Sequence, residues 1–153
     1  MALEAPLSKY KRHNFYIGLA VCLVMAAWFA YDGYINESFI KDHTNEQGQP
    51  DSTLVFNQKS PPFFVLGALF CGGCFYAIRN RKVVAGDDAL LIAGKRRIPY
   101  DAIEKIDKTH FDKKGVFTIY YKNEQGRECR RTLSDREYDR LGPVLDHLIA
   151  QIT

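Results

Sequence analysis

Two apolar runs without a charged residue lie in the first half of this 153-residue chain. They cover residues 15–31 and 61–78, and basic residues flank the outer end of each run. An α-helix satisfies its own backbone hydrogen bonds in hydrocarbon, so apolar runs of this length are typical of membrane-spanning helices. At about 1.5 Å per residue, each run reaches roughly 26 Å of a hydrocarbon core about 30 Å thick. The runs therefore predict two transmembrane helices.

Two other structures contain such runs: a soluble core with two buried helices, and a signal peptide. A soluble core seldom holds two charge-free runs joined by a polar loop. A signal peptide ending at Ala27 or Ala30 needs small residues just before its cleavage site, where this chain has Met25 and Trp28. We therefore expect an uncleaved anchor.

Basic residues predict the orientation of the two helices. Three precede the first helix and three follow the second: Lys9, Lys11, Arg12, Arg79, Arg81 and Lys82. The segment between the two apolar runs, residues 32–60, carries two lysines against five acidic residues. Cytoplasmic flanks are rich in lysine and arginine, so both termini are predicted to be cytoplasmic and the connecting loop external.

This pattern divides the chain into five segments. They are a basic cytoplasmic N-terminus at 1–14, helices at 15–34 and 61–78, an external polar loop at 35–60, and a cytoplasmic domain at 79–153. The external loop is rich in turn residues between positions 45 and 52, so we expect it to be the least structured part of the chain.

Small residues recur along one side of each predicted transmembrane helix. They are Gly18, Cys22, Ala26 and Ala30 on the first helix, and Gly67, Cys71 and Cys74 on the second. Small residues allow close approach of helix backbones in lipid. These positions predict helix packing, either within the hairpin or against a neighbouring subunit.

Cys71 and Cys74 also have the spacing of a redox dithiol. Such pairs act through a stabilised thiolate, which burial in an apolar helix opposes. The pair also lacks the strand-then-helix context of a redox fold. We favour packing and keep a membrane thiol–disulfide protein as the alternative function.

From residue 82 the composition is that of a small soluble domain. Short β-prone runs cover residues 82–85, 89–93, 96–99, 103–111, 116–122 and 127–133. Turn residues separate them, including the stretch from Asp112 to Gly115, and Phe117, Ile119 and Tyr121 alternate onto one face. The pattern predicts an antiparallel meander of five or six strands.

An amphipathic helix is predicted from Ser134 to Ile152. Ser134 is a candidate N-cap, with Glu137 completing a capping box three residues later. Apolar residues then recur at helical spacing, and we expect a kink at Pro143.

Two stretches of this part of the chain carry a family resemblance: Ile98-Pro-Tyr-Asp-Ala-Ile-Glu-Lys-Ile106 and Gly115-Val-Phe-Thr-Ile-Tyr-Tyr. Together with the order of antiparallel strands followed by one amphipathic helix, they resemble the bacterial pleckstrin-homology-like (PH-like) domains of small membrane proteins. The resemblance covers residues 83–152. It implies an α+β protein of the bacterial cytoplasmic membrane, with a two-helix hairpin and a binding or scaffolding domain that lacks catalytic residues. The stretch is one strand short of a full barrel, so we expect an open one.

Basic residues near the predicted membrane are candidates for contact with anionic lipid: Arg79, Arg81, Lys82, Lys95, Arg96 and Arg97. Residues 79–153 hold 16 basic and 12 acidic side chains, a mild excess that favours nonspecific attraction over a dedicated headgroup pocket. No stacking aromatics interleave with the basic pairs, so nucleic acid is not expected.

The sequence predicts no catalytic, metal or cofactor site. Its four histidines, at positions 13, 43, 110 and 147, lack companions at metal-ligand spacing. No glycine-rich phosphate loop precedes a helix. The expected partners are the bilayer and a membrane protein or a second copy of the chain.

Overall fold

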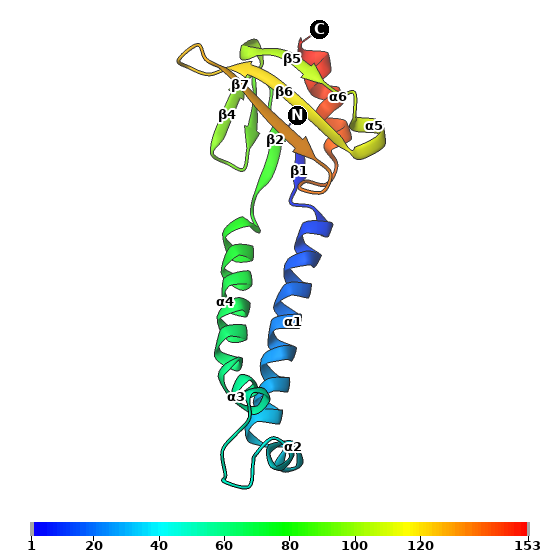
Figure 1. Ribbon diagram of the computed structural model, residues 1–153. Helices are drawn as coiled ribbons and strands as arrows, with labels where there is room; N and C mark the ends of the chain where they lie inside the picture. The colour runs from blue at the N-terminus through cyan, green and yellow to red at the C-terminus, as the bar shows by residue number, and fades with distance from the viewer. Residues whose placement is uncertain (1, 153) are drawn as a thin grey trace. The chain divides into compact units, whose positions relative to one another are not determined.

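The computed structural model describes residues 2–152, so Met1 and Thr153, the outer ends of the predicted terminal segments, lie outside it. The chain forms two compact units. One unit contains both ends of the chain, up to Arg12 and from Ile78 onward, and the other is His13–Ala77. Two long apolar helices and two small antiparallel sheets make an α+β protein, as the sequence predicted (Figure 1).

Two segments are long and apolar enough to cross a membrane. Helix α1 spans Lys9–Tyr34 and begins six residues before the predicted start at residue 15. Helix α4 spans Pro61–Ile78, the predicted range, and continues from the short helix α3, Ser52–Lys59. The most apolar window of each segment has a mean hydropathy of 1.7 and is only 6% buried.

The segment that we expected to be the least structured part of the chain contains two short helices on either side of a turn. It contains helix α2, Glu37–Asp42, as well as α3. The side chains of Asn36 and Asp51 accept hydrogen bonds from backbone amides at the starts of α2 and α3. Asp51 also lies 2.7 Å from the His43 ring. Residues that favour turns therefore act here as helix caps.

Within residues 2–152, seven strands form two antiparallel sheets (Figure 1). The four-stranded sheet has the order β1, Leu3–Pro6; β2, Lys82–Ala85; β3, Ala89–Ile92; and β4, Arg96–Pro99. The three-stranded sheet has the order β5, Ile103–Asp107; β6, Val116–Lys122; and β7, Glu128–Ser134. The helical elements of this unit are η1, Tyr100–Ala102; α5, Phe111–Lys114; and α6, Leu141–Ile152.

Residues 1–14 were predicted to be only a basic flank, but they contain strand β1. It pairs with β2 in a register that joins Leu3 to Ala85 and Pro6 to Lys82. Ala5 is fully buried in the core of this unit. Sequence periodicity missed the strand because it has four residues, ends in proline and finds its partner far along the chain. Proline is tolerated because β1 is an edge strand.

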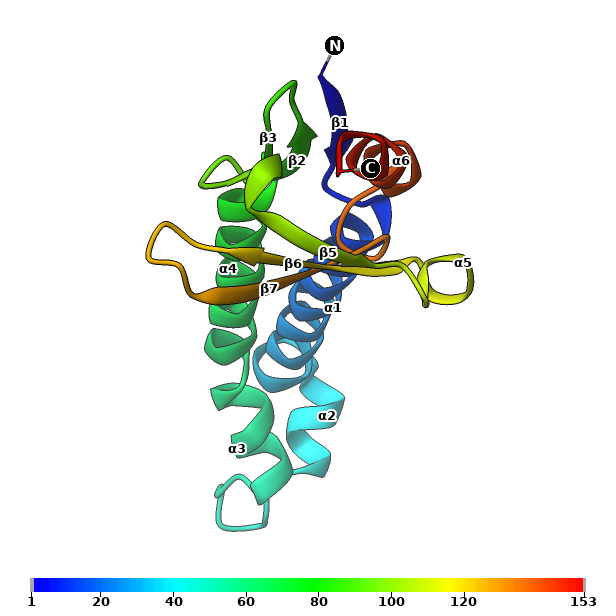
Figure 2. The ribbon, with the colours of Figure 1, turned by 90° about the horizontal axis from the view of Figure 1, so that it is seen from above.

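The core lies between the sheets and α6. Phe117, Ile119 and Tyr121 are buried on one face of β6, as their alternation predicted. Helix α6 packs against β1, β2 and η1 (Figure 2). Its buried residues are Leu141, Val144, Leu145 and Leu148.

The C-terminal helix begins later than predicted, and the expected capping box is absent. Ser134 ends β7, and its carbonyl accepts hydrogen bonds from the amides of Glu137 and Tyr138 in a tight turn. Pro143 lies in the first turn of α6 and causes no kink within a longer helix. Proline fits this position because first-turn amides have no partner within the helix.

The predicted strand at residues 103–111 is also shorter than expected. It ends at Asp107, and the single turn α5 follows. Gly115 ends that turn at a φ of +62°, a left-handed conformation that glycine adopts readily. The chain still forms the predicted β5–β6 hairpin.

We predict that replacing Ala5 by Asp disrupts the four-stranded sheet. The new carboxylate would enter a fully buried site without a partner, at a cost of about 3–5 kcal/mol. The measurement is amide hydrogen exchange of β2 and β3 with the full chain in detergent micelles.

The matched control is Glu4→Ala on the opposite face of β1. Glu4 is exposed and pairs with Lys82 at the surface, so its loss should change protection little. Equal loss of protection in both variants would contradict the assigned strand register.

Candidate functional site

Helices α1 and α4 meet through matching glycine–cysteine pairs. Each helix carries a Gly-x-x-x-Cys pattern, Gly18 with Cys22 and Gly67 with Cys71. A Cβ atom added at Gly18 would lie 3.5 Å from the Cys71 Sγ, and one added at Gly67 would lie 3.3 Å from the Cys22 Sγ. Each glycine therefore leaves room for the cysteine side chain of the other helix.

Aromatic contacts continue this seam in both directions. The Phe75 ring lies 5.0 Å from Tyr16 and 6.2 Å from Phe15 between ring centroids. Beyond the glycine–cysteine pairs, the Phe29 ring lies 5.4 Å from Phe64. Contact positions recur every three or four residues, as in an antiparallel coiled coil.

At the end of α1, the seam reaches α3. A Cβ atom added at Gly33 would lie 3.0 Å from the backbone carbonyl carbon of Asn57, so only glycine allows this approach without displacement. The Tyr34 hydroxyl donates to the carbonyl of Gln58, and the Gln58 amide donates to the carbonyl of Gly33. Helix α3 is therefore fastened to the end of α1.

The structure brings most of the predicted packing residues into this hairpin. Gly18, Cys22, Gly67 and Cys71 contact one another across the helices, and Ala26 is buried. The remaining two predicted residues, Ala30 and Cys74, are half-buried. All four cysteines, at positions 22, 71, 74 and 129, are free thiols.

The outer faces of α1 and α4 are apolar and exposed. Large side chains there include Ile17, Val21, Val24, Trp28, Phe63, Leu66, Leu69 and Phe70, each more than half exposed. In a water-soluble protein such a surface would normally be covered.

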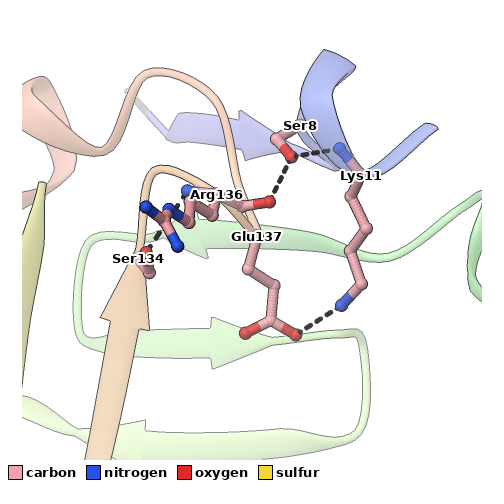
Figure 3. Close-up of polar contacts among 5 residues, drawn as sticks. All are labelled: Ser8, Lys11, Ser134, Arg136 and Glu137. Atoms are coloured by element: carbon pink, nitrogen blue, oxygen red, sulfur yellow. Dashed lines mark hydrogen bonds and ion pairs between the residues drawn. The ribbon is translucent and has the colours of Figure 1, made fainter. Parts of the chain in front are cut away.

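The start of α1 is held by the connection between β7 and α6 (Figure 3). Ser8 is fully buried, its hydroxyl donates to the Arg136 carbonyl at 2.5 Å, and the same oxygen accepts from the Lys11 amide at 3.1 Å. The Lys9 amide donates to the Asp139 carboxylate at 3.1 Å. These bonds satisfy amides of the first helical turn that have no partner within the helix.

Backbone and ionic contacts strengthen the same junction. The Ser8 amide donates to the Glu137 carbonyl, and the Asp139 amide donates to the Pro6 carbonyl. The Lys11 ammonium lies 3.1 Å from the Glu137 carboxylate. The sequence predicted that Glu137 caps a helix. Its ionic partner, Lys11, lies 126 residues away and could not be recognised from a local pattern.

Five of the six predicted lipid-contact residues occupy one end of the four-stranded sheet and the adjoining segment, whereas the Arg97 side chain pairs with Asp88 in the turn at the opposite end. Arg79 and Arg81 lie between α4 and β2, and Lys82 begins β2 beside Pro6. The Ala93 amide donates to the Lys82 carbonyl, so the β3–β4 turn lies at this same end. Lys95, Arg96 and Arg97 follow in that turn and in β4.

The opposite end of the same sheet is acidic. Asp87 and Asp88 lie in the β2–β3 turn, where the carbonyl of Gly86 accepts from the Tyr100 hydroxyl and lies 3.2 Å from the His147 ring. Partial burial raises the pKa of Tyr100, and the two aspartates add to this shift. Tyr100 therefore stays neutral and holds the turn.

A groove of about 540 Å³ lies between β4 and the β6–β7 turn. Lys95, Arg96 and Lys122 stand along it, and Tyr121 and Cys129 contribute its apolar part. The sequence placed Lys95 and Arg96 in a basic cluster but could not show that the β6–β7 turn approaches them. Among residues 2–152, no group of three or more metal-ligating side chains is assembled.

We predict that Gly67→Leu separates α1 from α4. The larger side chain overlaps the Cys22 thiol, and overpacking of this kind costs about 1–3 kcal/mol. Cys22 should then react faster with N-ethylmaleimide in detergent micelles, as quantified by peptide mass spectrometry. Gly73→Leu is the control, because a Cβ atom there meets no neighbour, and unchanged Cys22 reactivity in Gly67→Leu would contradict the seam.

We predict that Asp135→Asn stabilises the sheet-containing unit at neutral pH. Partial burial raises the pKa of Asp135 above 3.8, and the neighbouring Asp139 carboxylate raises it further. Because the pKa of Asp135 is raised in the folded state, the protonated acid favours folding. The free energy of unfolding therefore falls as pH rises through this raised pKa. Hydrogen exchange should show the variant more protected at pH 7 and the difference closing below pH 3.8; a constant difference would contradict the titration.

Comparison with known protein families, with curated proteins and with solved structures returned no match to this chain.

Proposed function

We propose that the chain is a non-enzymatic integral membrane protein that presents a PH-like interaction domain at the cytoplasmic surface. The observation that carries this proposal is the pairing of β1 with β2, which flank the α1–α4 hairpin on either side. A single sheet thus contains residues from before and after both apolar helices.

The helix surfaces support membrane insertion. Only 6% of the apolar windows is buried, whereas the helices of a soluble core are mostly buried. The small residues face the partner helix and the large apolar side chains face outward. This distribution suits a lipid solvent, in which close backbone packing holds helices together.

The shared sheet supports a hairpin topology. If both helices span the bilayer, β1 and β2 must lie on the same side, since they exchange backbone hydrogen bonds. The basic residues on both outer flanks support a cytoplasmic location for that side, because cytoplasmic flanks are rich in lysine and arginine. The bacterial cytoplasmic membrane, implied by the family resemblance, is the proposed location.

The sheet arrangement supports the PH-like assignment. A four-stranded and a three-stranded antiparallel sheet precede a terminal amphipathic helix. Strand β1 supplies the seventh strand that the stretch after α4 does not contain. The hairpin is thus inserted between the first two strands of the proposed domain.

The basic end of the sheet supports attraction to anionic lipid. Only residues 79–81 separate the end of α4 from β2 in the chain, and two of them are arginines. Each lysine or arginine near an anionic surface contributes about 1 kcal/mol. Lys95, Arg96 and Arg97 are exposed and would add to the contribution of the basic linker.

No contact of Cys71 or Cys74 favours the alternative redox function. The two residues are not disulfide-bonded, and the Cys71 sulfur packs against Gly18. We therefore propose the interaction role alone.

Topology is tested by cysteine labelling of the full chain in bacterial cells. Ala2→Cys and Lys113→Cys should be protected from a membrane-impermeant maleimide, whereas Gln47→Cys between the helices should react. All three should react after permeabilisation, and peptide mass spectrometry distinguishes them from the native thiols.

Two outcomes would overturn the proposal. One is recovery of the chain in the soluble fraction. The other is labelling of Ala2→Cys and Lys113→Cys from opposite sides of the membrane, which the β1–β2 pairing forbids.

A further inference from the structure

We propose that the groove between β4 and the β6–β7 turn binds an extended acidic segment of a partner protein. This inference rests on the proposed interaction role of the domain and names the chemistry of its partner. Three features of the groove carry it: an open strand edge, basic walls and a partly apolar floor.

The open edge is provided by β4. It pairs with β3 on one side, from Ile92 opposite Arg96 to Ala89 opposite Pro99. On its other side, no strand within residues 2–152 pairs with it. An edge strand presents unpaired backbone groups on its open side. Pro99 has no amide hydrogen, so an incoming extended peptide would pair with the amide donors that precede it and with β4 carbonyls as an additional strand.

The walls select an acidic segment. Lys95, Arg96 and Arg97 stand on the β4 side and Lys122 on the β6 side, whereas Glu124 is the one acidic residue that lines the groove. The pKa of Lys122 is raised by its hydrogen bond and charge contact with Glu104, so it remains positively charged. Carboxylates of an incoming strand would therefore meet complementary charge.

The floor accommodates apolar residues of the same segment. Tyr121 is 7% exposed and Cys129 is half-buried, and both line the groove beside Pro99. Side chains alternate between the two faces of an extended strand. A segment that alternates acidic and apolar residues would direct the apolar ones to this floor and the acidic ones toward the walls.

These features favour a peptide over a lipid headgroup. Arg97 already pairs with Asp88, and Lys122 pairs with Glu104, so the cations do not converge as free charges on one point. Both pairs are exposed and therefore weak enough for an incoming carboxylate to exchange with them. A headgroup phosphate would use neither the backbone edge nor the apolar floor.

The test uses the full chain in phosphatidylcholine nanodiscs and the fluorescein-labelled peptide Glu-Val-Asp-Val-Glu-Val-Asp. Saturable binding is expected by fluorescence anisotropy. The double reversal Lys95→Glu with Arg96→Glu should weaken binding by about tenfold or more, since both charges line the groove. Both side chains are exposed, so the reversal does not disturb the core.

The matched control is Lys113→Glu with Lys114→Glu on α5. It makes the same change in net charge at exposed residues outside the groove and should leave affinity unchanged. Hydrogen exchange should also show new protection of the β4 amides when the peptide binds.

Three results would overturn the inference. They are absence of saturable peptide binding, equal weakening by the α5 control, and protection located away from β4. Binding of soluble dioctanoyl phosphatidylglycerol in place of the peptide, lost on reversal of Lys95 and Arg96, would assign the walls to lipid instead. None of these results alters membrane insertion or topology, which the cysteine labelling measures separately.

Discussion

The backbone hydrogen bonds between β1 and β2 are the contact on which the rest of the structure depends. They join residues that the whole α1–α4 hairpin separates in sequence, and they complete the four-stranded sheet on which α6 packs. The same contact brings Ser8 beside the β7–α6 connection, whose carbonyl and carboxylate groups fix the first turn of α1. The start of α1 and the folding of the β domain are therefore coupled through one short strand.

Local sequence patterns predicted the elements whose signals lie within one segment. The absence of charge predicted α4 at its observed ends, and alternation predicted the buried face of β6 at Phe117, Ile119 and Tyr121. Elements that depend on distant partners were missed or misplaced. Four residues ending in proline carry no recognisable strand signal, and Glu137, three residues after Ser134, satisfies a capping-box pattern even though its partner is Lys11.

The candidate sites divide in the same way: features within one segment were predictable, and contacts between distant segments were not. The spacing of Gly18 with Cys22 and of Gly67 with Cys71 indicated a packing surface on each helix. The pairing of each glycine with the cysteine of the other helix became evident only from the register of the antiparallel helices. The groove beside β4 was not predictable, because two turns about thirty residues apart in sequence must approach each other to form it. Composition showed the excess of basic residues, whereas the fold determines which of them line the same wall of the groove beside β4.

Because the α1–α4 hairpin lies between β1 and β2 in the sequence, the two strands are synthesised at different times. The ribosome makes β1 first, yet its partner emerges only after both apolar helices have been synthesised. The nascent strand β1 must therefore remain unpaired until both apolar helices and β2 have been synthesised. Until β1 pairs, the edge of β2 stays open, the type of surface that proteases and aggregation exploit. Closure of the sheet therefore depends on a strand that must wait for its partner during synthesis.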